Sequence, residues 1–176
     1  MSGITVEQLQ AAIRDVPDFP KPGVTFKDIT PILSDPKLFS SVIDILADEA
    51  ATSRPDKIVG IDARGFLFGA AVAYKLRCGF IPVRKKGKLP YKSLSFAYEL
   101  EYGSAEMEMH VDAISPGERV VLVDDLLATG GTSGAAIQLV QQTGGKVEAA
   151  LFFIELTFLN GRQRLGDVPV RTLVRF

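Results

Sequence analysis

The stretch VVLVDDLLATGG, residues 120–131, places two adjacent acids where an apolar strand is expected to end. These acids are Asp124 and Asp125, and the small residues after them lead into a predicted helix. The free N–H groups and the dipole of a helix N-terminus favour an anion such as a phosphate. Two carboxylates cannot help to hold that phosphate, but they can accept hydrogen bonds from vicinal hydroxyls. The stretch therefore suits a ribose 5-phosphate.

The alternative interpretation of this stretch is structural. Asp124 and Asp125 would then cap a turn, and the glycines would serve the backbone conformation of that turn. Two known phosphate motifs do not fit, because no Gly-Lys-Ser/Thr follows and the glycines lack the GxGxxG spacing. The stretch alone leaves both interpretations open.

The elements that must position these acids alternate between apolar strands and helices. The expected strands are KIVGI, FIPVR, RVVLV, VEAALFFI and VRTLV, and the helices between them are RGFLFGAAVAYKL and GTSGAAIQLVQQTGG. This alternation indicates a doubly wound α/β domain with a mainly parallel sheet covered on both faces. Ligands bind outside the carboxyl ends of the strands in such a sheet, and Asp124 and Asp125 fall at one of those ends.

Between about residues 86 and 110 the pattern changes to that of a hairpin. The runs FAYEL and AEMEMH each alternate between apolar and polar residues, and they flank Tyr102-Gly103. This pattern predicts a β-hairpin that projects from the sheet, and a hairpin beside the active edge of a sheet is a candidate lid. We call this hairpin the hood.

The N-terminal part precedes the alternating pattern. A first helix is expected over about residues 6–14, with Thr5 and Gln8 forming a capping box. A Pro- and Gly-rich stretch follows, whose prolines exclude a regular helix. A second helix then begins at Pro36 with Asp35 as its cap.

Composition restricts the class of protein. The 176 residues are 47% hydrophobic and 23% charged with a net charge of −1, which is typical of one soluble globular domain, residues 1–176, and argues against nucleic acid as a partner. Cys78 is the only cysteine, so we expect a reducing compartment, the cytoplasm. No apolar run is long enough to span a membrane, and no signal peptide is expected. No cluster has metal-ligand spacing, so no protein-built metal site is predicted.

Several stretches resemble the type I phosphoribosyltransferases. VVLVDDLLATGGT resembles their signature for 5-phosphoribosyl 1-pyrophosphate (PRPP), and further stretches are similar to the members that use adenine: DFPKPGVTFKDITPIL, GIDARGFLFGAAVA, PVRKKGKLP, LEYG and ELTFLNGR. The similarity extends over nearly the whole chain in the expected order. It implies an enzyme that makes AMP and pyrophosphate from adenine and PRPP. It also implies Mg²⁺ bound through the PRPP phosphates and water, and a homodimer.

The resemblance assigns the donor site. Asp124 and Asp125 would hold the ribose hydroxyls. The 5-phosphate would be held by Ala128, Thr129, Gly130, Gly131 and Thr132.

The pyrophosphate is assigned to two basic segments by the same resemblance. DARG, residues 62–65, becomes the pyrophosphate loop, with Arg64 as a catalytic anion contact, and the family often has a cis peptide there. RKKGK supplies Arg84, Lys85 and Lys88, whereas Lys86 is expected to be solvated. The alternatives are a surface charge for Arg64 and a solvated face or RNA patch for the basic run, although no aromatic residues are interleaved with it.

The resemblance places the catalytic glutamate at Glu101, with Tyr102 beside it in the hood. A carboxylate closed into a dry site could take the N9 proton of adenine or stabilise the protonated base. The alternative is an exposed strand acid like Glu99.

The implied base site is VTFKD. Phe26 would stack on the purine, the backbone of Thr25 and Lys27 would bind its edge, and Leu126 would close the opposite face. A fixed C=O and N–H pair discriminates between adenine and hypoxanthine, because the wrong base leaves buried polar groups unpaired. The alternative for Phe26 is an anchor of the Pro-rich stretch.

Two other functions are compatible with the fold. One is a transferase for another purine base, since base choice depends on backbone geometry. The other is a ligand-sensing regulator of nucleic acid, which would need several helices before the core, whereas about one is expected here.

Overall fold

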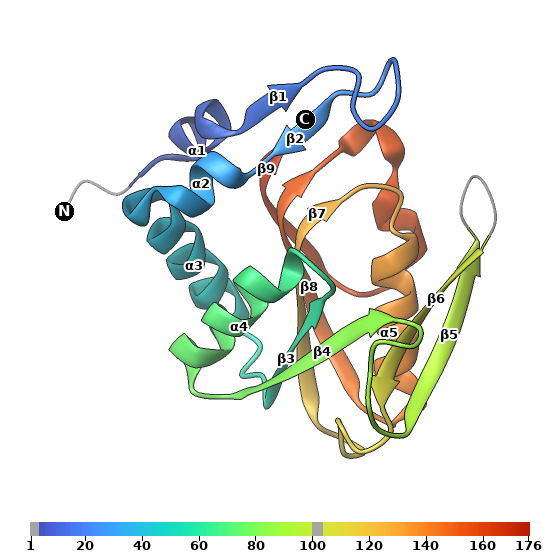
Figure 1. Cartoon of the computed structure of the whole chain (residues 1–176). Coiled ribbons are helices and arrows are strands. Elements are labelled where there is room, and N and C mark those ends of the chain that lie inside the picture. Colours follow the sequence, from blue (N-terminus) through green and yellow to red (C-terminus); the bar gives the residue numbers. More distant parts are fainter. Residues whose placement is uncertain (1–3, 100–103) are drawn as a thin grey trace. The chain divides into compact units, whose positions relative to one another are not determined.

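The computed structural model describes residues 4–99 and 104–176 of the chain. The chain divides into two compact units, Met1–Ile45 and Leu46–Phe176, with the boundary inside helix α3 (Pro36–Ala51) (Figure 1). Each unit is described by itself below.

The first unit contains two short helices and two short strands before α3: α1 (Val6–Ala12), β1 (Arg14–Val16), β2 (Phe26–Asp28) and α2 (Thr30–Ser34). The predicted capping box is present, since Thr5 and Gln8 each accept a hydrogen bond from the backbone N–H of the other. Helix α1 ends two residues earlier than expected, because β1 begins at Arg14 and pairs antiparallel with β2. The sequence did not predict β1, β2 or α2.

The Pro-rich stretch forms the connection between β1 and β2. Its Phe19–Pro20 peptide bond is cis, and the carboxylate of Asp18 accepts a hydrogen bond of 2.8 Å from the Gly23 N–H. The rings of Phe19 and Phe26 meet edge to face with their centroids 5.2 Å apart. Residues 17–25 of the stretch therefore form an ordered loop. The expectation that the prolines exclude a helix is wrong for the end of the stretch, because α2 begins at Thr30 and Pro31 lies in its first turn, where a proline is tolerated.

Helix α3 begins as expected. The carboxylate of Asp35 accepts hydrogen bonds from the N–H groups of Lys37 and Leu38, at 2.8 and 3.0 Å, which satisfies the first turn. Its buried residues recur at helical spacing and include Val42, Ile43, Leu46 and Ala50.

The second unit is built on a seven-stranded sheet with the order β5-β6-β4-β3-β7-β8-β9. The strands β4, β3, β7, β8 and β9 are parallel to one another, whereas β6 pairs antiparallel with both β4 and β5. The parallel strands are β3 (Lys57–Ile61), β4 (Gly79–Lys85), β7 (Arg119–Leu127), β8 (Lys146–Glu155) and β9 (Val170–Arg175). The predicted strands and the mainly parallel sheet are confirmed.

Helices cover both faces of this sheet. Helix α4 (Gly65–Leu76) packs on β3, β4 and β7, and α5 (Gly131–Gln142) packs on the opposite face and on the hood (Figure 1). Side chains on a strand alternate between the two faces, so Val59 and Ile61 of β3 face α5, whereas Ile58 lies against α4 at Gly69. The core under α5 also includes Leu122, Ile137, Leu139 and Phe152, all buried.

The predicted hood is present as β5 (Ser93–Glu99) and β6 (Ser104–His110). Strand β6 joins the sheet through two residue pairs at the end of β4, Arg84 with Glu108 and Lys85 with Met107. One face of the hood is apolar as its alternation predicts, and Met107 and Met109 are fully buried. Glu108 is also buried, although it lies on the polar side of the pattern, because its carboxylate accepts a hydrogen bond from the Gly87 N–H.

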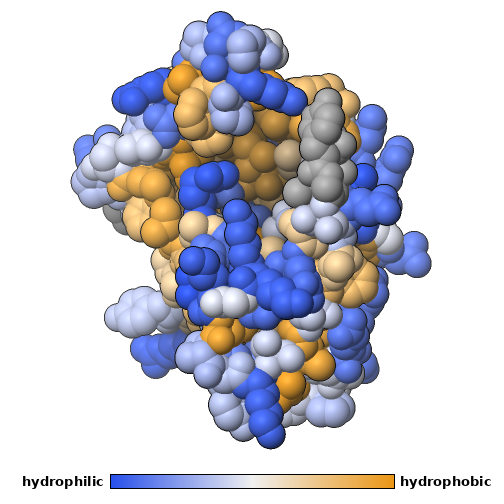
Figure 2. Space-filling view, turned by 45° about the vertical axis from the view of Figure 1, so that its right-hand side comes forward, coloured by the Kyte–Doolittle hydropathy of each residue, from blue (hydrophilic) through white to orange (hydrophobic). Residues whose placement is uncertain are grey.

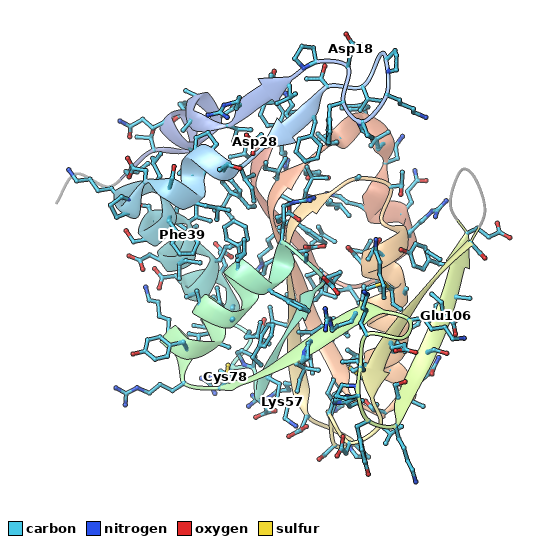
Figure 3. The ribbon with its side chains drawn as sticks, in the orientation of Figure 1. Asp18, Asp28, Phe39, Lys57, Cys78 and Glu106 are labelled. Carbon is cyan, nitrogen blue, oxygen red and sulfur yellow. The ribbon has the colours of Figure 1, made fainter. Side chains whose placement is uncertain are left out.

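Lys57 is the first residue of β3 and marks the amino end of this strand, at the bottom of the view in Figure 3. The ammonium group of Lys57 donates to the Ala113 carbonyl at 2.7 Å and pairs with Glu118 at 2.8 Å. These contacts tie the start of β3 to the chain that precedes β7. Among the helices of the described residues, none is both long enough and apolar enough to cross a membrane.

After β8 the chain forms two 3₁₀ helices, η1 (Thr157–Leu159) and η2 (Gly161–Leu165), and a buried carboxylate binds the second of them. Glu155, at the end of β8, is 5% exposed and accepts two hydrogen bonds from Arg162 of η2, at 2.6 and 2.7 Å. Arg162 also donates to the Val170 carbonyl of β9, and Thr172 donates to Glu155. The hydrogen bonds from Arg162 hold the pKa of Glu155 below its ordinary value.

We expect Arg162→Gln to lower the free energy of unfolding by about 1.5–3 kcal/mol, the usual range for hydrogen bonds to a charged group. Urea unfolding followed by circular dichroism measures this loss. Lys86→Gln is the matched control, because Lys86 pairs with Glu106 on the exposed surface, where solvent screens the pair and its effect on stability is small. Equal losses in the two variants would contradict the assigned role of Arg162.

The same comparison should depend on pH. Because the folded state lowers the pKa of Glu155, the carboxylate stabilises the protein above its ordinary pKa and loses this effect as the pH falls through the folded value. We therefore expect the difference in stability between the wild type and Arg162→Gln to be constant above about pH 4.5 and to shrink below it. A constant difference down to acid unfolding would contradict this linkage.

Candidate active site

A cavity of about 650 Å³ opens at the carboxyl ends of β3, β4 and β7 and at the N-terminus of α5. This is the position at which open α/β sheets bind their ligands. Most of the predicted site residues line this one cavity: Arg64, Arg84, Lys85, Lys88, Asp124, Asp125, Leu126, Ala128, Thr129, Gly130, Gly131 and Thr132.

Asp124 and Asp125 lie within the last residues of β7 and not beyond it, because this strand runs four residues farther than RVVLV predicts. They are 8% and 5% exposed. The Asp125 N–H donates to Asp124 Oδ1 at 2.9 Å. Burial, and then the neighbouring charge of Asp125, raise the pKa of Asp124 well above its ordinary value.

The carboxylate of Asp124 fits against the first residue of α4. A Cβ atom on Gly65 would lie 2.5 Å from Asp124 Oδ1, which is closer than real Cβ atoms approach. Gly65 therefore allows the start of α4 and the end of β7 to meet at the cavity. Its place in DARG has this structural reason besides any contact with a ligand.

Two ion pairs hold the arginines of the cavity. Arg64 Nε donates to Asp125 Oδ2 at 2.5 Å, and Arg84 Nε donates to Asp62 Oδ2 at 2.9 Å. Arg84 also donates to the Lys88 carbonyl at 3.2 Å, and its guanidinium carbon lies 5.9 Å from the centre of the Phe66 ring. The arginines are thus positioned by acids at the same strand ends. The Asp62–Ala63 peptide is cis, in the place where the resemblance implies one.

The lysines of RKKGK differ in their surroundings. Lys85 and Lys88 line the cavity and are exposed, whereas Lys86 does not line it and pairs with Glu106 at 2.7 Å. Figure 2 shows a group of hydrophilic residues near the middle of one face, bordered by hydrophobic ones. The cavity can therefore offer several cations to an anionic ligand at once.

The loop before α5 has a backbone conformation that requires glycine. Gly130 has a φ of +80°, a backbone conformation that residues other than glycine rarely adopt. Its carbonyl accepts a hydrogen bond from the Gly134 N–H where α5 begins. The loop is supported by η2, because a Cβ on Gly130 would lie 2.2 Å from the Gly161 carbonyl oxygen. A Cβ on Gly161 would lie equally close to the Ala128 carbonyl oxygen.

The remaining predicted residues fall elsewhere. Thr25, Phe26 and Lys27 belong to the first unit, where Phe26 and Lys27 are in β2 and the Lys27 ammonium pairs with Asp15 at 2.7 Å. Glu101 and Tyr102 lie outside the described residues.

Sequence reasoning missed Ser133 as a residue of the cavity, and it placed Asp62 in the pyrophosphate loop without giving this side chain a role. Asp62 is the first residue after β3 and positions Arg84, so its place directly after an apolar strand was the available signal. Ser133 is buried and follows Thr132 in the first turn of α5, where it lines the same cavity.

The fold and the cavity define a class of protein. A buried acidic pair, a glycine loop at a helix N-terminus and a group of cations surround one space, which suits a sugar carrying phosphates on two sides. The sequence profile of the phosphoribosyl transferase domain matches residues 28–168.

Known proteins narrow this class. The chain is 56% identical over 170 residues to the adenine phosphoribosyltransferase of Methylorubrum populi, covering 96% of this chain and 94% of that one. It is 53% identical to that of Agrobacterium fabrum, covering 98% and 97%. The crystal structure of adenine phosphoribosyltransferase from Thermoanaerobacter pseudethanolicus matches with a TM-score of 0.95 at 52% identity, covering 98% and 100%.

A fourth relative was solved with ligands. It is the adenine phosphoribosyltransferase of Saccharomyces cerevisiae, complexed with an imino-altritol bisphosphate and adenine, and it matches with a TM-score of 0.90 at 43% identity, covering 96% and 97%. This chain therefore belongs to the phosphoribosyltransferase family, and within it to the adenine phosphoribosyltransferases.

The glycine contact beneath the loop gives a prediction. We expect Gly130→Ala to weaken the binding of ribose 5-phosphate by more than about 10-fold, a free-energy loss above about 1.4 kcal/mol, because the new Cβ pushes the loop away from Gly161. Isothermal titration calorimetry measures this change. Gly117→Ala is the matched control, since Gly117 also has a positive φ, +85°, but a Cβ there meets no atom within 4 Å. An unchanged affinity in Gly130→Ala would contradict the assignment of the loop.

Proposed function

We propose that this protein transfers the 5-phosphoribosyl group from PRPP to adenine, giving AMP and pyrophosphate, a reaction of purine salvage. The observation that carries this proposal is the cavity in which the acidic pair of β7, the glycine loop before α5, Arg64 and the cations at the end of β4 meet. The family membership of the chain supports the same reaction.

The cations are proposed to stabilise the leaving pyrophosphate. Departure of pyrophosphate places negative charge on the leaving group, and Arg64, Arg84, Lys85 and Lys88 surround the space for it. In the free protein the two arginines are paired with Asp125 and Asp62. These pairs hold the guanidinium groups in the cavity before the donor binds, so less ordering is needed on binding.

The acids are proposed to bind the ribose and to favour its cationic transition state. Asp124 and Asp125 are buried at the end of β7, next to the loop that would hold the 5-phosphate. Their oxygens can accept hydrogen bonds from the ribose hydroxyls. Positive charge that develops on the ring also favours the ionised form of Asp124, against the effect of burial.

The base site is proposed to include Thr25, Phe26 and Lys27, with Leu126 on the cavity wall. The ammonium group of Lys27 is paired with Asp15, and the proposed contacts with the edge of the base come from the main chain of Thr25 and Lys27. The ring of Phe26 is half-buried, and its edge-to-face contact with Phe19 also supports the alternative role of an anchor for the Pro-rich stretch.

Glu101 is proposed as the catalytic residue that takes the N9 proton of adenine or stabilises the protonated base, with Tyr102 as a neighbouring contact. The hood supports this proposal, because β5 and β6 bring the ends of the segment that contains both residues next to each other, at Glu99 and Ser104.

Mg²⁺ is proposed to bind through the PRPP phosphates and water. Carboxylate oxygens suit this ion, and those of Asp124 and Asp125 border the cavity, whereas residues 4–99 and 104–176 contain no group of three or more His, Cys, Asp or Glu that could hold a metal. When bound, Mg²⁺ would neutralise charge on the pyrophosphate. The residues of the chain would still orient the donor.

We further propose that residues 1–176 act as one domain in a cytoplasmic homodimer. The exposed face of α4 supports self-association, because Leu67, Ala70 and Tyr74 recur along it and Tyr74 is 88% exposed. The single cysteine supports a reducing compartment.

The reaction is tested by a steady-state assay with PRPP and Mg²⁺ in which adenine, hypoxanthine and guanine are offered in parallel. We expect AMP from adenine, and rates at least about 100-fold lower with either oxopurine, because those bases leave buried hydrogen-bonding groups unpaired. Product formation is followed by chromatography. Transfer to an oxopurine alone would overturn the base site but keep the donor site, and no transfer to any base would overturn the proposed reaction.

The catalytic assignment is tested by Glu101→Gln. We expect kcat to fall by about 100-fold or more, in the range for removal of a general acid or base, while the dissociation constant for PRPP stays unchanged. Glu99→Gln is the matched control, because Glu99 is an exposed acid near the same end of the hood. If both variants keep the wild-type kcat, Glu101 has no part in proton transfer.

A further inference from the structure

A hydrogen bond joins the hood to the loop that would hold the 5-phosphate. The hydroxyl of Tyr98 in β5 lies 3.0 Å from Oγ1 of Thr132 in the first turn of α5. Thr132 lines the large cavity, whereas Tyr98 lines a smaller one of about 280 Å³ that shares Gly130 and Gly131 with it. Tyr98 therefore reaches Thr132 from outside the donor site.

The ring of Tyr98 is fixed in this position by packing. It lies over Gly131, where a Cβ would be 2.9 Å from a ring carbon, and it packs against the buried core under α5. The next residue is also held, since Arg164 of η2 donates to the Glu99 carbonyl at 3.4 Å. The hydroxyl of Tyr98 is thus presented to Thr132 by a rigid ring.

The direction of this hydrogen bond follows from the chemistry of the two hydroxyls. Either oxygen can be the donor in the free protein. Each hydroxyl has a single proton, and an ionised phosphate oxygen only accepts. When Thr132 donates its proton to a phosphate, Tyr98 must be the donor to Oγ1 of Thr132.

We propose that Tyr98 is a positioning residue for the 5-phosphate, which acts by donating to Thr132 and directing the Thr132 hydroxyl at the phosphate. Hydrogen bonds in such a chain strengthen one another, and the tyrosine also restricts the rotation of the threonine hydroxyl. The inference rests on the proposed phosphate site and deepens it. It also couples the hood to the loop of residues 128–132, which we call the donor loop, since phosphate binding strengthens the contact that holds β5.

The first test measures the binding of ribose 5-phosphate to the full chain by isothermal titration calorimetry. We expect Tyr98→Phe to weaken binding by about 2- to 10-fold, the equivalent of one neutral hydrogen bond. Tyr91→Phe makes the same chemical change next to the hood, at a ring that is 56% exposed and contacts His110, and should leave the affinity unchanged. Equal affinities of Tyr98→Phe and the wild type would overturn the proposal.

A double-mutant cycle identifies Thr132 as the partner. In the Thr132→Val background, Tyr98→Phe should not weaken the binding of ribose 5-phosphate further, because the threonine hydroxyl that Tyr98 orients is gone. In the Thr132→Ser background, which keeps a hydroxyl, Tyr98→Phe should again weaken binding. Additive effects in the valine background would overturn the proposal.

A second ligand separates positioning from general damage to the fold. Tyr98→Phe should leave the affinity for pyrophosphate with Mg²⁺ unchanged, since that subsite uses other residues, and an equal loss for both ligands would overturn the proposal. The formation of AMP by the wild type tests the proposed function and not the role of Tyr98. A wild type that binds ribose 5-phosphate but makes no AMP contradicts the proposed function, while the cycle still decides the role of Tyr98.

Discussion

The donor loop depends on a contact between two pieces of backbone that leaves no room for a side chain. Gly130 and Gly161 approach so closely that a Cβ on either would lie 2.2 Å from a carbonyl oxygen. The 3₁₀ helix η2 therefore packs directly against the backbone of the loop. Glu155 in turn binds η2 through two hydrogen bonds from Arg162. The conformation of this loop thus depends on the C-terminal part of the chain, whose described residues contribute no side chain to the cavity lining.

The same region connects the loop to the hood. Arg164 follows Arg162 by two positions, and it reaches the Glu99 carbonyl, while Tyr98 reaches Thr132 from the same strand end. The end of β5 is consequently held to the N-terminus of α5 and to η2 at once. A site that binds a phosphate at this N-terminus and carries its proposed catalytic residue in the hood gains preorganisation from these links.

The two arginines of the cavity are paired with acids before any ligand arrives. Arg64 with Asp125, and Arg84 with Asp62, join residues that lie at three neighbouring strand ends. Such pairs are expected where a ligand has both an anionic part and a part that becomes cationic. The arginine can then bind the anionic part, and the aspartate can stabilise the part that becomes cationic. The burial of Asp124 adds a carboxyl group whose charged form is disfavoured until positive charge lies nearby.

The sequence by itself determined the parallel strands, the helices between them, the capping of α1 and α3, and the acids and small residues of the donor loop. These features depend on local periodicity, capping and turn chemistry, which neighbouring residues carry. Only the tertiary structure decided that Asp62 positions Arg84, that Gly161 supports Gly130, and that Tyr98 contacts Thr132. These are contacts between residues distant in the chain, and their geometry follows from strand order and packing, which no local pattern records. For the same reason β1 and β2, short strands that exist only through pairing with each other, were missed.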